Sequence, residues 1–406
     1  MKGTTVLISG AGIAGPALAY WLDRHGLVPT LLERAPAPRT GGYVIDFWGL
    51  GYDLAERMGV LPDVLRAGYR VREVRVVDRH GRRAGGFDAE VFRAATIGRY
   101  TSLPRGDLAA ILLRAVGGRV EARFGDAITG LDDRADGVEV RFAHGSPRRF
   151  DLVVGADGQH SGVRALAFGP EPRFERFLRY TVAAFETSGY PFRDEDVYVA
   201  YSVPGRQIAR FSLRDDRTLF LIVIAEAAAD VVAARDEAAQ RGYLRERLAG
   251  LGWECPQIVA ALERAGEVYL DTVSQIRVER WTKGRVALVG DAAYAPSLLA
   301  GQGSALAIIG AYVLAGELAR AQRPEEAFAR YEALLGPFLR EKQAAAETFA
   351  GAFAPRTRLG IILRNQITKL FAVPSLAKLA LGNGLLDRIQ LPRYEDGEGV
   401  TGGLKA

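Results

Sequence analysis

The 406-residue chain contains a single cysteine and only four histidines. Cys255 has no partner in the chain for a disulfide, so we interpret it as structural, with covalent attachment of a ligand as the alternative. Zinc sites need more thiols or histidines at ligand spacing, and these four histidines are far apart, with no HExxH motif. We therefore predict no metal site, and we find no Ser–His–Asp or Cys–His constellation.

An excess of one charge is also missing. The chain has 53 Lys and Arg against 48 Asp and Glu, a net charge of +5, and the basic residues are interleaved with acidic ones. This pattern does not indicate nucleic-acid binding. The first residues lead directly into the strand-like segment 5–9, which does not resemble a signal peptide and is too short to span a bilayer. With 49% hydrophobic residues, we expect a cytoplasmic globular protein without integral membrane association, acting as a monomer or weak dimer.

The first motif lies between two predicted strands. Thr5–Ser9 forms an apolar strand, residues 10–15 read GAGIAG, a helical pattern follows, and a second strand over 28–32 ends at Glu33. The first glycine permits a tight turn, Gly12 lets the backbone approach a pyrophosphate, and the third lets the helix pack on the sheet. The helix N-terminus attracts phosphate, and Glu33 can accept hydrogen bonds from a ribose hydroxyl. This context predicts a dinucleotide site, and the alternative is a glycine-rich turn without a ligand.

The rest of the chain alternates helical and strand patterns. Helices are expected from Arg105, near 231–249, and over about 303–321 and 324–346. The segment 172–228 is β-rich, as in an antiparallel sheet. Individual strands are expected at 120–124, 138–142, 152–154, 197–203, 208–213, 219–224, 268–276 and 286–290.

Two further turns carry an acid where a buried strand ends. One is Gly155-Ala156-Asp157-Gly158, and the other is Gly290-Asp291, followed by Gly301-Gln302-Gly303 at the start of a helix. In α/β sheets, ligands bind at this end of the strands. We therefore expect both acids at the same site as the first motif.

The three motifs, in this order and spacing over residues 4–345, resemble the p-hydroxybenzoate hydroxylase-like class A flavin monooxygenases. A narrower likeness to the tetracycline-inactivating branch rests on residues 41–42, 46, 281–285, 290–297, 310–318 and 391–395. The resemblance implies FAD as cofactor, with NADPH or NADH and O₂ as co-substrates. It implies hydroxylation, through a flavin hydroperoxide, of an aromatic or polycyclic polyketide-like molecule such as a tetracycline-type antibiotic. Baeyer–Villiger oxygenation, or a flavin-binding protein without monooxygenase turnover, is the alternative.

The resemblance also assigns residues to the site. Implied for cofactor binding are Gly10, Gly12, Ala14, Gly15, Glu33, Arg34, Asp46, Arg105, Asp157, Gly158, Asp291, Gly301 and Gly303. Candidates for the substrate pocket are Phe185, Tyr201, Phe211, Pro296 and Leu298, of which the three aromatic residues could equally be core. Two departures from the family pattern, Leu298 for proline and Ala305 for asparagine, are expected to affect flavin mobility or substrate access. No catalytic side chain is assigned, because the flavin carries the chemistry.

The expected fold is α/β. A Rossmann-like FAD-binding domain, with an inserted antiparallel-sheet substrate domain, is followed by C-terminal helices. The FAD-binding parts are residues 1–70, 101–171 and 281–345; the substrate parts are 71–100 and 172–280; residues 346–406 form a helical gate and tail. Within that last part, residues 358–389 could alternatively form an interfacial membrane helix or an amphipathic helix packed on its own domain.

Three polar residues outside the motifs have two interpretations each. His160, next to Gly158, is either a proton relay or a polar turn residue. Arg206 and Arg210 either meet an acidic substrate or the phosphates of the nicotinamide cofactor, or are surface strand arginines.

Overall fold

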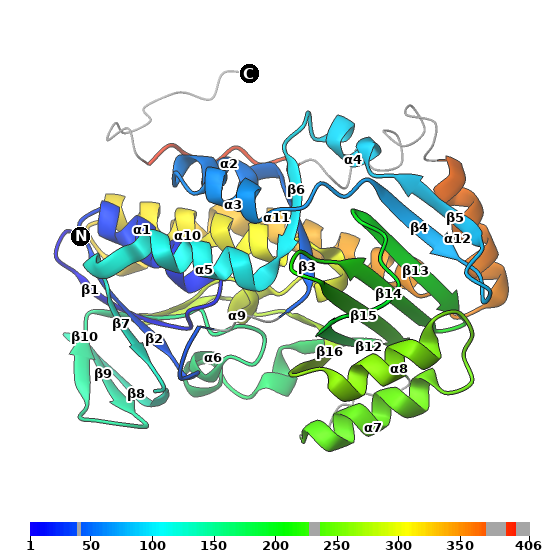
Figure 1. Ribbon diagram of the computed structural model, residues 1–406. Helices are drawn as coiled ribbons and strands as arrows, with labels where there is room; N and C mark the ends of the chain where they lie inside the picture. Colours follow the sequence, from blue (N-terminus) through cyan, green and yellow to red (C-terminus); the bar gives the residue numbers. More distant parts are fainter. Residues whose placement is uncertain (39–41, 227–235, 371–386, 395–406) are drawn as a thin grey trace.

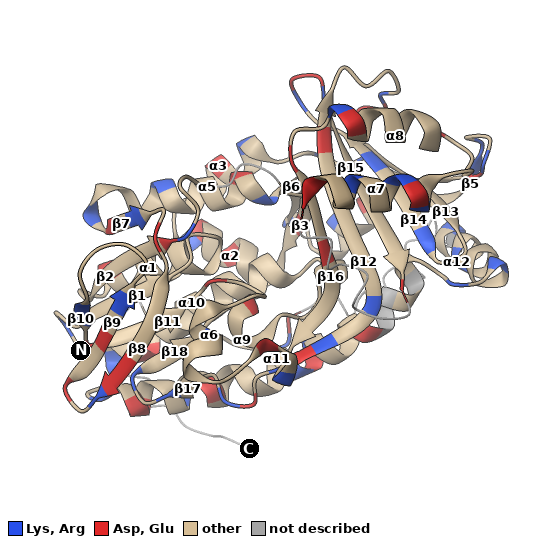
Figure 2. Ribbon diagram, turned by 90° about the horizontal axis from the view of Figure 1, so that it is seen from below, with Lys and Arg blue, Asp and Glu red and all other residues tan. Residues whose placement is uncertain are grey.

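A computed structural model of the protein describes residues 1–38, 42–226, 236–370 and 387–394. Two large β-sheets lie on opposite sides of the molecule, and charged residues of both signs are spread over each side (Figure 2). The mixed α/β class expected from the sequence is confirmed.

The first large sheet carries the glycine-rich motif. Its strand order is β17-β18-β11-β1-β2-β7, and all neighbours are parallel except the pair β17 and β18. The strands are β1 (Thr5–Ser9), β2 (Val28–Glu33), β7 (Glu121–Phe124), β11 (Leu152–Gly155), β17 (Thr282–Lys283) and β18 (Val286–Leu288). The five mutually parallel strands of this sheet end at one edge, where residues after β1, β11 and β18 meet.

Helices cover one face of this sheet, and a small sheet covers the other (Figure 1). The helices are α1 (Ala14–Arg24), α5 (Arg105–Val116), α10 (Gly303–Arg320) and α11 (Pro324–Phe353). The small antiparallel sheet consists of β8 (Ile128–Arg134), β9 (Gly137–Phe142) and β10 (Arg148–Phe150). Among the described residues, only α10 is long and apolar enough to cross a bilayer, but 78% of that stretch is buried inside the protein, as in a core helix.

The second large sheet has the order β16-β12-β15-β14-β13-β4-β5 and is antiparallel except for the parallel pair β13 and β4. Its strands are β4 (Glu73–Val77), β5 (Arg83–Asp88), β12 (Glu175–Ser188), β13 (Val197–Val203), β14 (Arg206–Ser212), β15 (Arg217–Ala225) and β16 (Val268–Ile276). Helices α7 (Glu237–Leu248) and α8 (Cys255–Arg264) pack on one face and form an apolar core with it.

The remaining elements connect the two sheets. A β-ladder of β3 (Val44–Trp48) and β6 (Tyr100–Pro104) stands between them (Figure 1). The short helices are α2 (Gly49–Arg57), α3 (Leu61–Ala67), α4 (Glu90–Ala95), α6 (Gly162–Ala167) and α9 (Asp291–Tyr294), with 3-10 turns η1 (Gly117–Arg119), η2 (Glu171–Arg173) and η4 (Leu298–Ala300). α2 packs so closely on α10 that a Cβ at Gly51 would lie 2.6 Å from the Cβ of Ala305. The small residue at 305 therefore fits this helix contact, where a larger side chain would crowd α2.

The helix expected near 231–249 corresponds in its described part to α7. Residues 227–235 lie outside the described residues, and α7 occupies 237–248. Cys255, expected between helices, is the first residue of a second helix, α8, and burial raises the pKa of its thiol to about 12. The signal for this helix was Pro256 in the first turn, followed by apolar residues at helical spacing. The buried, protonated thiol supports the structural interpretation of Cys255.

The C-terminal part of the chain packs in two places. Helix α12 (Arg358–Leu370) contacts β5 and β13 at the far edge of the second sheet, where Arg364 donates hydrogen bonds to Gln207 and Ser202. Its outward side chains Leu359, Ile362, Leu363 and Ile367 are exposed. The described part of the expected membrane-or-gate segment is thus a helix that packs one side on its own chain and leaves apolar side chains exposed, and residues 371–386 of that segment lie outside the described residues.

Tyr394 attaches the end of the described chain to the first sheet's helices. Its ring is 5% exposed and packs against α10 at Gly316, and its hydroxyl donates a 2.7 Å hydrogen bond to Glu317. The neighbouring carboxylate oxygen of Glu317 accepts a bond from Arg330 of α11. Residue 394 therefore belongs to the apolar core beside the first sheet.

We expect Tyr394→Ala to lower the free energy of unfolding by about 3 kcal/mol, because it leaves a cavity beside Gly316 and removes the partner of a buried carboxylate. Tyr394→Phe, which keeps the ring, should cost only about 1 kcal/mol. Urea unfolding followed by tryptophan fluorescence measures both. Equal losses for the two variants would show that packing of the ring contributes nothing.

Candidate functional site

A cavity of about 660 Å³ opens where the C-terminal edge of the six-stranded sheet faces the seven-stranded sheet. Residues from all three sequence motifs line it, together with side chains of β12, β16 and η4. Of the residues implied for cofactor binding, those that line it are Gly10, Gly12, Ala14, Glu33, Arg34, Arg105, Asp157, Gly158, Asp291, Gly301 and Gly303. Segments distant in sequence thus meet at one place, as parallel strands with aligned ends require.

The turn between β1 and α1 forms the first wall. Gly10 has φ +108°, and a Cβ there would overlap the carbonyl of Ala156. A Cβ at Gly15 would overlap the carbonyl of Gly10. At Gly12, by contrast, the nearest atom to an added Cβ is Nη2 of Arg105, at 3.7 Å. The fold itself requires Gly10 and Gly15, whereas the space in front of Gly12 is open toward the cavity.

Helix α1 presents its N-terminus to the same wall. No side chain caps its N-terminus, and its first turn has no acidic residue. Its first N–H groups and positive dipole end are therefore available to an anion. Nearby, the carboxylate of Glu33 accepts hydrogen bonds from the backbone N–H of Ala11 (2.8 Å) and Ala35 (2.9 Å), which fixes it at the end of β2. An open backbone approach beside an uncapped helix N-terminus fits the pyrophosphate of a dinucleotide.

The second wall is the turn between β11 and α6. The Asp157 carboxylate accepts hydrogen bonds from the Ser161 hydroxyl and from the Val163 N–H, and burial raises its pKa. Ser161 in turn caps α6 by accepting from the N–H of Arg164 at 3.0 Å. These bonds hold the acid in a fixed position on the cavity surface.

Arg164 joins this turn to the Asp291 turn. Its side chain is fully buried, and it donates to the carbonyls of Ala292 (3.0 Å) and Gln159 (2.6 Å) and to the Glu171 carboxylate (2.7 Å). Burial lowers the pKa of its guanidinium. One side chain thus sets the relative positions of two acid-bearing turns of the cavity.

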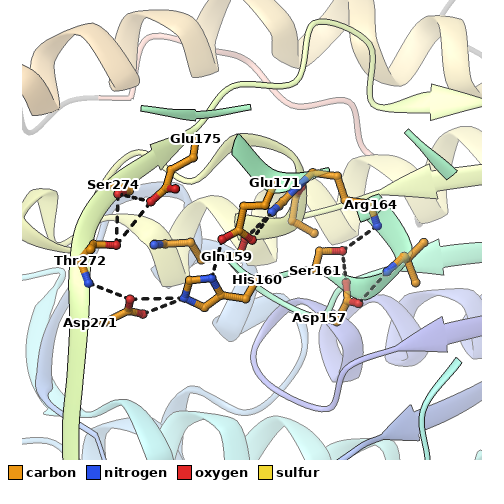
Figure 3. A network of polar contacts seen from close by, with 12 residues as sticks. Asp157, Gln159, His160, Ser161, Arg164, Glu171, Glu175, Asp271, Thr272 and Ser274 are labelled. Atoms are coloured by element: carbon orange, nitrogen blue, oxygen red, sulfur yellow. Dashed lines mark hydrogen bonds and ion pairs between the residues drawn. The ribbon is translucent and has the colours of Figure 1, made fainter. Parts of the chain in front are cut away.

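His160 lies at the rim of the cavity between two carboxylates (Figure 3). Nδ1 is 2.8 Å from Glu171 of η2, and Nε2 is 3.2 Å from Asp271 of β16. These two hydrogen bonds, Asp271 first, raise the pKa of the imidazole to about 10. His160 is therefore more than a polar turn residue, because it connects the Asp157 turn to the second sheet.

This pairing predicts a pH dependence of stability. The folded-state pKa of His160 is raised. Its contribution to the free energy of unfolding is therefore complete below the unfolded-state pKa of about 6.5 and is lost as the pH rises toward about 10. The difference in unfolding free energy between wild type and His160→Gln should therefore shrink steadily between pH 6.5 and 10. Urea titrations at three pH values in that window measure it, and a constant difference would contradict the pairing.

Asp291 and the N-terminus of α10 form the third wall. Gly290 turns the chain with φ +66°, and Oδ1 of Asp291 lies 3.5 Å from where a Cβ at Gly303 would stand. Burial raises the pKa of the Asp291 carboxyl, while the Arg105 guanidinium lowers it. The first turn of α10 lines the cavity through Gly303, Ser304 and Ala307, so its positive dipole end faces inward.

The second sheet and η4 close the cavity on the far side. Pro296 and Leu298 line it, and Ser297 between them has a strained φ of +127°. Phe185 borders the cavity but is 2% exposed and stacks on Phe220, so most of its ring belongs to the core. The sequence analysis did not single out several polar lining residues, among them Tyr43, Glu186, Arg217, Tyr269 and Asp271.

Four of the residues assigned from the sequence lie outside the cavity lining. Gly15 packs against Gly10, and Asp46 accepts 2.6 Å hydrogen bonds from the hydroxyls of Tyr100 and Ser102. Tyr201 is buried under α8, next to Trp253. Phe211 packs edge-on against Tyr69 in a separate core.

The two arginines of β14 also point elsewhere. Arg210 is 4% exposed and pairs with Glu254 and Asp194, and Arg206 donates to the carbonyl of Arg247. They are neither pocket residues nor solvated surface arginines, because each connects the sheet to a neighbouring segment.

Comparison with known proteins agrees with this geometry. Residues 3–340 match the family described as FAD binding domain. The chain is 36% identical to a flavin-dependent monooxygenase from an unknown prokaryotic organism, with 84% of this chain and 87% of that protein covered. It is 32% identical to a flavin-dependent monooxygenase of Legionella longbeachae, with 97% and 99% covered. Among solved structures, tetracycline destructase Tet(55) superposes with a TM-score of 0.82 at 32% identity, over 97% of this chain and 100% of that one.

Proposed function

The chain belongs to this FAD-binding family and is a class A flavin-dependent monooxygenase of the tetracycline-destructase branch, and on that premise we propose that it uses NADPH or NADH and O₂ to place one oxygen atom on an aromatic or polycyclic polyketide-like substrate. The observation that carries the proposal is the meeting of Gly12, Asp157 and Asp291, from three separate turns, on one cavity that extends to the second sheet.

The protein binds FAD, and the cavity residues fit it. We place the pyrophosphate at Gly12 and the N-terminus of α1, where the backbone is open and N–H groups are free. Glu33 and Arg34, at the end of β2, would hold the adenosine part. FAD supplies the redox chemistry, accepting a hydride and activating O₂.

The remaining motif residues would orient the flavin. Asp157 and Asp291 offer fixed carboxylate acceptors, and Arg105 offers a positive charge between the β1 turn and Asp291. The N-terminus of α10 would stabilise negative charge on a reduced ring system. Pro296 and Leu298 would exclude water from the face on which the substrate lies.

The proposal is tested by turnover under ¹⁸O₂. We expect NADPH oxidation by the purified holoenzyme to accelerate when a hydroxylated polycyclic compound, tetracycline among them, is added. The product should gain one ¹⁸O atom per molecule by mass spectrometry. If every compound yields only hydrogen peroxide at an unchanged rate, monooxygenation of this substrate class is contradicted.

A further inference from the structure

Helix α12 packs on the second sheet with its polar side. The Arg364 guanidinium donates a 2.9 Å hydrogen bond to the side-chain oxygen of Gln207 on β14. Asn365 is buried against β5, and the Thr368 hydroxyl accepts a hydrogen bond from a backbone N–H of the same strand. These contacts fix the rotation of the helix about its axis, because all three side chains lie on one face of it.

The opposite side of α12 is aliphatic and faces outward. Leu359, Ile362, Leu363 and Ile367 recur at helical spacing, so they form one stripe along the helix, and each residue is 44% to 74% exposed. A surface helix normally buries its apolar stripe and exposes its polar side, so α12 has the reverse orientation. It lies at the outer edge of the molecule, beside β5 (Figure 1). A contiguous apolar stripe on an outer edge indicates an interaction surface.

The charges around this stripe are of one sign. Arg358 and Lys369, both exposed, lie near the two ends of α12, and the helix contains no acidic residue (Figure 2). Of the two strands that α12 contacts, β13 has no acidic residue, and β5 has only Asp88, at its C-terminal end. The stripe therefore lies in a positive environment, which complements a negatively charged surface.

We propose that α12 is a docking surface for an anionic lipid bilayer, in which the aliphatic stripe enters the interfacial layer while Arg358 and Lys369 meet the lipid headgroups. Helices that lie in this layer bind by burial of apolar area together with electrostatic attraction to anionic lipids. The surface is separate from the FAD cavity, whose described lining residues include none of α12.

A second copy of the chain fits the same surface less well. If two α12 helices packed on each other, the charges of Arg358 and Lys369 that they bring to the contact would all be positive. The helix also has no aromatic residue, whereas protein interfaces are usually centred on tyrosine, tryptophan and arginine. Lipid chains need neither opposite charge within the stripe nor a shaped partner for its side chains.

Binding is measured by co-sedimentation of the FAD-loaded protein with sucrose-loaded vesicles, which needs no turnover. We expect wild type to bind vesicles of POPC mixed with POPG at least about tenfold more tightly than vesicles of POPC alone, and high salt to remove this difference. Ile362→Gln combined with Leu363→Gln should lower the partition coefficient at least about tenfold. Arg358→Gln combined with Lys369→Gln should lower it by a similar factor on POPG vesicles only.

Two leucines of other helices provide the matched control. Leu65 of α3 and Leu166 of α6 are 47% and 45% exposed, so Leu65→Gln combined with Leu166→Gln removes similar apolar area elsewhere and should bind as wild type does. A dye locates the contact, because Cys255 is the only cysteine and is buried. An environment-sensitive dye on Leu363→Cys should shift its emission to the blue with POPG vesicles, and the same dye on Leu65→Cys should not.

The proposal is overturned if wild type does not sediment with POPG vesicles, if the Ile362 and Leu363 variant binds as well as the control, or if the dye at position 363 does not respond. A dimer that only this variant loses, without vesicle binding, would instead assign the surface to a second copy. Flavin content and Tm of each variant show whether it is folded, and the dye on otherwise unchanged protein tests the contact independently of the glutamine variants.

Discussion

Gly12→Val is expected to fold as stably as wild type and to bind FAD at least about 100-fold more weakly. Within the protein, a Cβ at Gly12 meets nothing closer than the flexible end of Arg105, at 3.7 Å, and its backbone φ is not positive. The added methyl groups would instead occupy the space in which the pyrophosphate approaches the backbone. Flavin content after purification and a titration of apoprotein with FAD measure the effect.

Gly15→Ala is the matched control in the same turn. Its methyl group would overlap the Gly10 carbonyl, so this variant should lose about 1 to 3 kcal/mol of stability or more. The two glycines therefore separate a ligand effect from a folding effect. Full flavin content in Gly12→Val would show that the pyrophosphate lies elsewhere.

Arg164→Leu is expected to lower the free energy of unfolding by about 3 to 5 kcal/mol. The guanidinium is fully buried, and its removal leaves the carbonyls of Gln159 and Ala292 and the Oε2 atom of Glu171 without the donor that Arg164 supplies. Because the same side chain connects the Asp157 and Asp291 turns, FAD affinity should fall as well.

Arg173→Leu, at an exposed position of the neighbouring η2 turn, serves as the control and should change stability by less than about 0.5 kcal/mol. Thermal unfolding of both variants with and without FAD gives the comparison. A loss below 1 kcal/mol for Arg164→Leu would contradict the role given to this buried side chain.

Local patterns predicted much of the fold. β1 and β16 have the bounds expected from sequence, and α10 begins at the expected Gly303, because apolar runs bounded by glycine or polar residues specify such elements locally. The order of the strands, by contrast, could not be predicted from local patterns. The parallel pairing of β4 with β13 joins residues more than 120 positions apart, and no local pattern encodes it.

The residues of the site could likewise be predicted from the sequence only in part. The turns of Gly12, Asp157 and Asp291 were recognisable because their residue types are unusual for a strand end. Tyr201 and Phe211 were indistinguishable in sequence from pocket residues, because alternation along a strand does not say which face meets a cavity. Tyr269 and Asp271 lie in an ordinary-looking strand, and only the packing of β16 against His160 distinguishes them.

The location of FAD is tested most directly by hydrogen–deuterium exchange of the apoprotein before and after FAD is added. We expect slower amide exchange in the turns that line the cavity, with β4, β5 and α12 unchanged, because none of their described residues borders it. The segments expected to gain protection are residues 10–14, 105–109, 157–163 and 301–307. Protection confined to other segments, or no protection despite bound flavin, would contradict the placement of the cofactor in this cavity.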